Sequence, residues 1–139
     1  MEQSRGHLTR RKIAKTAIVL LDQGGLEGLS MRKLGGRLGV EAMSLYNHVR
    51  NKADLLDAIH ETLMEGMAGS LRSAQAGADW QAIAQGMTRA FLTLLQSHPN
   101  AIPLFASRSA IAPGSLVMVD GAVGVLIQAG FTPDESIKI

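Results

Sequence analysis

The sequence predicts an all-α fold in which a three-helix head with a helix-turn-helix precedes a helical-bundle body. Apolar residues recur at helical spacing along most of the 139 residues, and glycines, prolines and capping residues separate these stretches. Charge is also divided unevenly: residues 1–52 hold ten Lys/Arg and four Asp/Glu, whereas the remainder has a net charge of −4. We therefore expect two domains, residues 1–51 and residues 52–139.

The first predicted helix begins after a cap at Thr9 and runs to about Gln23. Its apolar residues form one inward stripe, namely Ile13, Ala14, Ala17, Ile18, Leu20 and Leu21. Gly24 and Gly25 are expected to end the helix. Residues 1–8 are expected to form a flexible, mildly basic arm.

A helix-turn-helix is predicted directly after this helix. Ser30 is a good N-cap, and Leu34 and Leu38 repeat at i, i+4 on one face of a short helix. Gly39 allows a left-handed turn, after which a second helix of about two turns is expected over residues 42–48. Two short helices joined by a turn that contains glycine define the motif.

Two glycines lie inside the first helix of this motif, where each costs about 1 kcal/mol relative to alanine. We expect Gly35 to lie where the two helices cross closely, because only a small residue fits there. No packing reason is apparent for Gly36.

The fourth predicted helix is capped by Asn51, with Asp54 as the partner in a short capping box. It runs to about Met67, and residues 69–77 are expected to form its fraying end and a loop. Asp79 caps the next helix, which stops at the His98-Pro99 pair.

Three further segments are predicted to be helical. A short broken helix is expected over residues 102–107 and an apolar helix over residues 116–129. Thr132 and Glu135 form a capping box around Pro133, which is a strong helix start. Because only four residues follow Glu135, we expect that the sequence is cut short.

The stretch LYNHVRNKADLL, residues 45–56, closely resembles the DNA-binding domain of the tetracycline-repressor (TetR) family. The resemblance runs without a gap from about Leu8 to Ile59. It implies a three-helix DNA-binding head and a larger all-helical body that dimerises and binds an effector. We therefore expect a sequence-specific regulator of transcription, a cytoplasmic repressor released from its operator by a small molecule. The resemblance also implies that the helices pairing two subunits would follow the end of this chain.

The expected DNA-binding residues are those that the second helix of the motif turns outward, together with cations on the flanking helices. They are Arg32, Ala42, Met43, Ser44, Tyr46, Asn47, His48 and Lys52. Arg32 suits a guanine edge and Asn47 suits a base or a phosphate, whereas Lys52 at a helix start suits a phosphate. The resemblance supports these roles for Arg32, Ser44, Tyr46 and Lys52.

Two of these positions differ from the tetracycline repressor itself. Ala42 stands in place of an amide side chain and Asn47 in place of an indole, so we expect a different operator sequence. Three residues have alternative interpretations: Tyr46 covers the core of the head, His48 packs or caps, and Arg37 is only solvated.

An effector pocket is expected in the body from apolar residues that suit an adaptable cavity, namely Met64, Met67, Met87, Phe91, Leu104, Phe105 and Met118. An alternative is that this stripe is plain core. The two histidines with which the tetracycline repressor holds its magnesium–drug complex align with Ala68 and Leu104. The resemblance therefore does not favour a metal–tetracycline effector.

Other function classes are less favoured. Asp57, His60, Glu61 and Met64 share a helix face, which is the pattern of a small acid–base enzyme, but no second metal-ligand pair or nucleophile accompanies them. A helical module that holds a protein partner through its methionines is the other alternative. The chain has no cysteine and no apolar run of about 20 residues. We expect no enzymatic activity, cofactor, metal or membrane partner.

Overall fold

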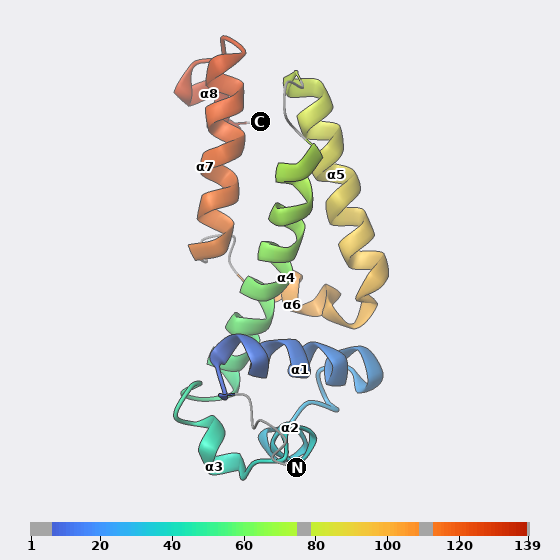
Figure 1. Cartoon of the computed structure of the whole chain (residues 1–139). Helices are drawn as coiled ribbons and strands as arrows, with labels where there is room; N and C mark the ends of the chain where they lie inside the picture. Colours follow the sequence, from blue (N-terminus) through green and yellow to red (C-terminus); the bar gives the residue numbers. More distant parts are fainter. Residues whose placement is uncertain (1–6, 75–78, 109–112, 139) are drawn as a thin grey trace. The chain divides into compact units, whose positions relative to one another are not determined.

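The computed structural model describes residues 7–74, 79–108 and 113–138, and this part of the chain is helical without a strand (Figure 1). The chain separates into two compact units. The first contains Met1–Thr62 and His98–Arg108, and the second contains Leu63–Ser97 and Ser109–Ile139. The expected arm, residues 1–8, lies largely outside the described residues.

The first unit has a continuous apolar core. It contains α1 (Arg10–Gly24), α2 (Met31–Leu38), α3 (Ala42–Leu45), the first part of α4 (Lys52–Ala74), the 3₁₀-helix η1 (Pro99–Ala101) and α6 (Ile102–Ser107). The largest fully buried side chains are Ile13, Leu21, Leu29, Leu34, Leu45, Val49, Leu55, Ile59 and Leu104. Burial of each stabilises the unit by roughly 1.5–3 kcal/mol, which fixes the rotation of each helix about its axis.

The helix starts predicted for α1 and α2 are confirmed. Thr9 Oγ1 accepts a hydrogen bond from the amide of Lys12 at 3.1 Å, and Ser30 Oγ accepts one from the amide of Lys33 at 3.2 Å. Gly25, with φ +66°, follows the last residue of α1. These caps satisfy amides that would otherwise have no intrahelical partner.

The turn between α2 and α3 depends on two glycines with different roles. Gly39 adopts the left-handed conformation at φ +68°, which glycine adopts at no steric cost. A Cβ atom on Gly35 would lie 2.8 Å from the carbonyl oxygen of Val40, so the expected close approach at this position is confirmed. Gly36 has nothing within 4 Å of the corresponding position.

The prediction of a two-turn second helix over residues 42–48 is wrong. The α-helix α3 covers only Ala42–Leu45, and a tighter turn follows. In this turn the amide of Tyr46 donates to Met43 O at 3.2 Å and that of His48 to Leu45 O at 2.9 Å, both three residues back. Such i→i+3 bonds reduce the number of residues per turn at a helix end.

The predicted end of α4 is also wrong, whereas its start is confirmed. Asn51 Oδ1 accepts a hydrogen bond from the amide of Asp54 at 2.9 Å. The helix then continues through Gly69 to Ala74, where fraying was expected. A single glycine costs only about 1 kcal/mol, which is too little to stop a long helix. Residues 75–77 of the expected loop lie outside the described residues.

The segment between α5 and α6 packs on the last turn of α1 within the first unit. The Asn100 amide donates to the carbonyl oxygens of Leu21 and Asp22, both at 3.0 Å. His98 Nδ1 lies 2.8 Å from the Asp22 carboxylate, and Ala101 is buried. The side chain of Asn100 thus binds two carbonyl groups in the last turn of α1, one of which, Leu21 O, also accepts from the amide of Gly25 at 2.8 Å.

The second unit contains the remainder of α4, α5 (Trp80–Ser97), α7 (Pro113–Gln128) and α8 (Pro133–Lys138). The predicted caps are confirmed, since Asp79 accepts from the amide of Ala82 at 2.8 Å and Glu135 accepts from the amide of Thr132 at 2.8 Å. The prediction that the apolar helix starts at residue 116 is wrong: α7 starts at Pro113, because proline is favoured at a first helical position.

Candidate nucleic-acid interface

One short helix of the first unit presents a set of side chains to solvent. Leu45, the last residue of α3, and Val49, four residues later, are buried, so they fix which side of this segment faces the core. Met43 is 75% exposed and Tyr46 is 44% exposed, although both are large. Asn47 is also exposed. The outward orientation predicted for these three residues is therefore observed.

The other predicted members of this surface are less exposed. Ala42, Ser44 and His48 are half-buried. The amide of Ser44 donates to Glu41 O at 3.0 Å, so the backbone at the start of α3 is already engaged. Half-burial fixes the position of these side chains while leaving part of each in solvent.

Cations come from the elements on either side of α3. Arg32 is the second residue of α2, and its side chain is exposed. Lys52 is the first residue of α4, and its Nζ lies 3.5 Å from the carbonyl oxygen of Leu26. The backbone of Lys52 lies at a helix start, where an anion is favoured, and its ammonium group is held by the Leu26 carbonyl. Lys33 and Arg37 are exposed on α2 as well.

A buried carboxylate fixes the start of α4. Asp54 Oδ2 accepts a hydrogen bond from the amide of Arg50 at 2.8 Å, and Asp54 Oδ1 lies 3.0 Å from a guanidinium nitrogen of Arg10 in α1. The hydrogen bond from Arg10 and the one from the Arg50 amide lower the pKa of Asp54 to about 2. The ion pair joins the first turn of α1 to the first turn of α4, and thereby positions Lys52.

Sequence reasoning missed two residues of this region, Arg50 and Arg10. The Arg50 side chain is 87% exposed between Val49 and Asn51, and its position as a basic residue next to the motif is a signal that could have identified it. The pairing of Arg10 with Asp54 joins residues 44 positions apart, for which the sequence offers no local signal.

Comparison with known proteins places this arrangement in a family. The sequence profile of bacterial regulatory proteins of the tetR family matches residues 13–59, and that of the tetracyclin repressor-like C-terminal domain matches residues 73–139. A solved TetR-family transcriptional regulator from Streptomyces coelicolor is 31% identical, with a TM-score of 0.71 over 93% of this chain and 73% of its own. The chain belongs to the TetR family.

Two further relatives are similar over most of this TetR-family chain. The class A tetracycline repressor of Escherichia coli is 32% identical over 91% of this chain and 57% of its own length. A TetR structure from Acinetobacter baumannii in complex with minocycline is 27% identical, with a TM-score of 0.76 over 94% of this chain and 72% of its own. The chain spans about half the length of the curated relatives it matches.

The residues expected to line an effector pocket are divided between the two units. Leu104, which is buried, and Phe105 belong to the first unit. Met64, Met67, Met87 and Phe91 belong to the second, where Met67 is buried and the other three are half-buried. The side chain of Met118 lies outside the described residues. A pocket formed by these residues stays a prediction.

The face of α4 that suggested acid–base chemistry makes packing and ion-pair contacts instead. His60 is buried, and its ring centroid lies 5.0 Å from that of Phe105. Burial, and then the positive charge of Arg108, lower the pKa of His60. The carboxylate of Asp57 pairs with the Arg108 guanidinium group. His60 therefore serves as a neutral core residue in this TetR-family chain.

Within residues 7–74, 79–108 and 113–138, no helix combines the length and the apolar character that crossing a bilayer requires.

Proposed function

We propose that this TetR-family protein is a transcriptional repressor that binds a duplex operator through its first unit and leaves it when a small apolar molecule binds. The observation that carries the proposal is the orientation of α3. Burial of Leu45 and Val49 leaves Met43, Tyr46 and Asn47 exposed, with cations on both flanking helices. This is the arrangement of a helix-turn-helix that reads the major groove.

The proposed contacts divide into two chemical classes. Arg32 pairs with a guanine edge and Asn47 with a base edge, which gives sequence specificity. Lys52, Ser44 and Tyr46 contact phosphates, which sets the register without reading sequence. Ala42, Met43 and His48 complete the surface, and Arg50 adds a further phosphate contact because its side chain is 87% exposed.

Release is proposed to act through α4, which contributes Lys52–Thr62 to the first unit and its remaining residues to the second. The Acinetobacter baumannii relative was solved with minocycline, which supports a small-molecule effector for the family. A ligand that displaces the second-unit end of α4 changes the position of Lys52. A coupling of about 1–3 kcal/mol would reduce operator affinity several-fold to a hundredfold.

The protein is proposed to act as a homodimer in the cytoplasm, and not as an enzyme. A two-fold dimer places two recognition helices about 34 Å apart, which matches successive major grooves. Residues 1–51 are proposed to form the DNA-binding domain and residues 52–139 the effector and dimerisation domain. The net charge of +6 on residues 1–52 supports this division, because phosphates attract that end of the chain.

Selection of bound duplexes from a random pool tests the proposal. We expect a recurrent, palindromic sequence and an affinity that falls steeply as salt rises, with about four to six phosphates neutralised per head. Arg89→Ala, which removes an exposed cation from α5 of the second unit, is the matched control and should leave the selected sequence and the salt response unchanged. Recovery of duplexes with no shared sequence, together with an affinity that does not change with salt concentration, would contradict the proposal and favour a protein-binding module.

A further inference from the structure

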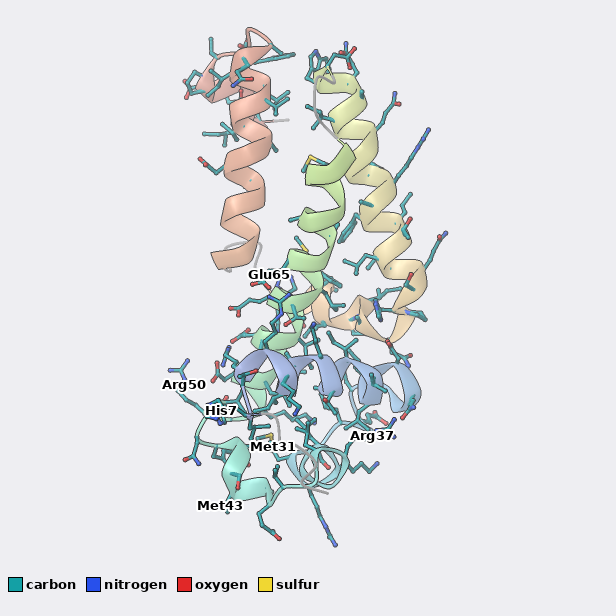
Figure 2. The ribbon with its side chains drawn as sticks, in the orientation of Figure 1. His7, Met31, Arg37, Met43, Arg50 and Glu65 are labelled. Carbon is teal, nitrogen blue, oxygen red and sulfur yellow. The ribbon has the colours of Figure 1, made fainter. Side chains whose placement is uncertain are left out.

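Met43 is the most exposed large hydrophobic residue on the proposed DNA-binding surface. Met43 is 75% exposed, and Figure 2 shows it on the side of α3 that faces away from α1. Leu45, two positions later, is fully buried. Residues two positions apart on a helix point in nearly opposite directions, so burial of Leu45 holds Met43 outward.

A thioether side chain at this position has few favourable partners on DNA. It carries no charge or strong donor for a phosphate, and it cannot form the paired hydrogen bonds by which amides and guanidinium groups read bases. In the major groove, the C5-methyl group of thymine is the apolar feature among the base edges. Ala42 beside Met43 is small, so it leaves space for a base edge, and the flexible methionine adapts to it.

We propose that Met43 is a specificity-determining residue that selects thymine by packing its side chain on the C5-methyl group. The inference rests on the proposed function, because it requires that α3 enter the major groove. It assigns one thymine in each operator half-site to Met43. It also follows that 5-methylcytosine binds better than cytosine at that position, since it carries the same methyl group.

Substitution of single thymines by deoxyuridine tests the inference, because this removes the methyl group and keeps the hydrogen-bonding pattern. The full chain is titrated with the duplex selected from the random pool and with each singly substituted version. One substitution per half-site should weaken wild-type binding about fourfold, the factor expected for burial of one methyl-sized group. In Met43→Ala this penalty should disappear, and in Met43→Leu it should persist.

The matched control is Leu92→Ala, which removes an exposed apolar side chain from α5 of the second unit. This variant should show the full wild-type penalty, and circular dichroism should show equal helicity for all variants. The inference would be overturned, and the proposed function left standing, by either of two results. One is that no deoxyuridine substitution weakens wild-type binding; the other is that Met43→Ala loses as much affinity on substitution as the wild type does. Recovery of no preferred duplex would overturn both this inference and the proposed function.

Discussion

Asp54 fixes the start of α4, next to the proposed DNA-binding surface. It is buried, accepts a hydrogen bond from the amide of Arg50 and pairs with Arg10. A buried carboxylate is tolerated only when its oxygens are paired. The interactions that lower its pKa therefore also stabilise the folded unit.

Asp54→Asn should lower the free energy of unfolding by about 2 kcal/mol at pH 7, since the folded-state pKa is about 2 and the ordinary pKa of an aspartate is 3.8. The stabilisation is present above the unfolded pKa and is lost as the pH falls through the folded value. The difference in free energy of unfolding between Asp54→Asn and wild type should thus shrink as the pH falls from about 4 to about 2. Urea unfolding across this range measures it, with the exposed Asp120→Asn as the control.

His60 should also make stability fall as the pH falls, but over a higher pH range than Asp54. Its pKa is lowered from 6.5 because the ring is buried, so the unfolded chain takes up the proton first as the pH falls. Wild-type stability should decline below about pH 6.5, whereas His60→Leu should decline less. Thermal unfolding at pH 7.5 and pH 5.5 compares them, with the exposed His7→Gln as the control. An identical decline in both proteins would show that His60 is not the titrating group.

At the scale of elements, α2 contains a matched pair of adjacent glycines, Gly35 and Gly36. Gly35→Ala places a Cβ 2.8 Å from Val40 O and should destabilise the protein by about 1–3 kcal/mol, because backbone must shift. Gly36→Ala meets nothing within 4 Å and should stabilise α2 by roughly 0.5–1 kcal/mol. Urea unfolding of both variants tests this. Equal effects would show that the turn does not depend on the close approach.

Local signals allowed prediction of most element starts from the sequence. Thr9, Ser30 and Asp79 each cap an amide three residues ahead, so the interaction is visible in a short stretch. The end of α3 was mispredicted because the choice between α-helical and tighter bonds after Leu45 depends on how the segment packs. The contact of Asn100 with Leu21 spans 79 residues, and no local pattern indicates it.

Which side chains of the proposed DNA-binding surface are buried and which are exposed was predictable to the same extent. Helical periodicity distinguished buried Leu45 from exposed Met43, and the resemblance to TetR regulators added Arg32 and Lys52. Periodicity does not reveal which distant residue pairs with Asp54, so the role of Arg10 emerged only from the folded unit. Burial and exposure along a single helix were therefore predictable, whereas pairings between residues on different helices were not.

At the scale of the whole molecule, the chain combines a basic N-terminal part with an acidic remainder. Residues 1–52 carry a net charge of +6 and residues 53–139 carry −4. Such asymmetry favours association of the basic part with phosphates and disfavours non-specific contact by the rest. One helix, α4, contributes to both compact units, so the proposed effector binding and the proposed DNA binding share a continuous element.

The most direct test of the account compares Arg32→Ala and Lys52→Ala on the selected duplex and on every single-base-pair variant of it. Lys52→Ala should weaken binding to all duplexes by a similar factor, because a phosphate contact carries no sequence information. Arg32→Ala should also relax the preference at one base pair, where arginine–guanine pairing discriminates by about 1–3 kcal/mol. A changed preferred sequence in Lys52→Ala, together with an unchanged one in Arg32→Ala, would contradict the account.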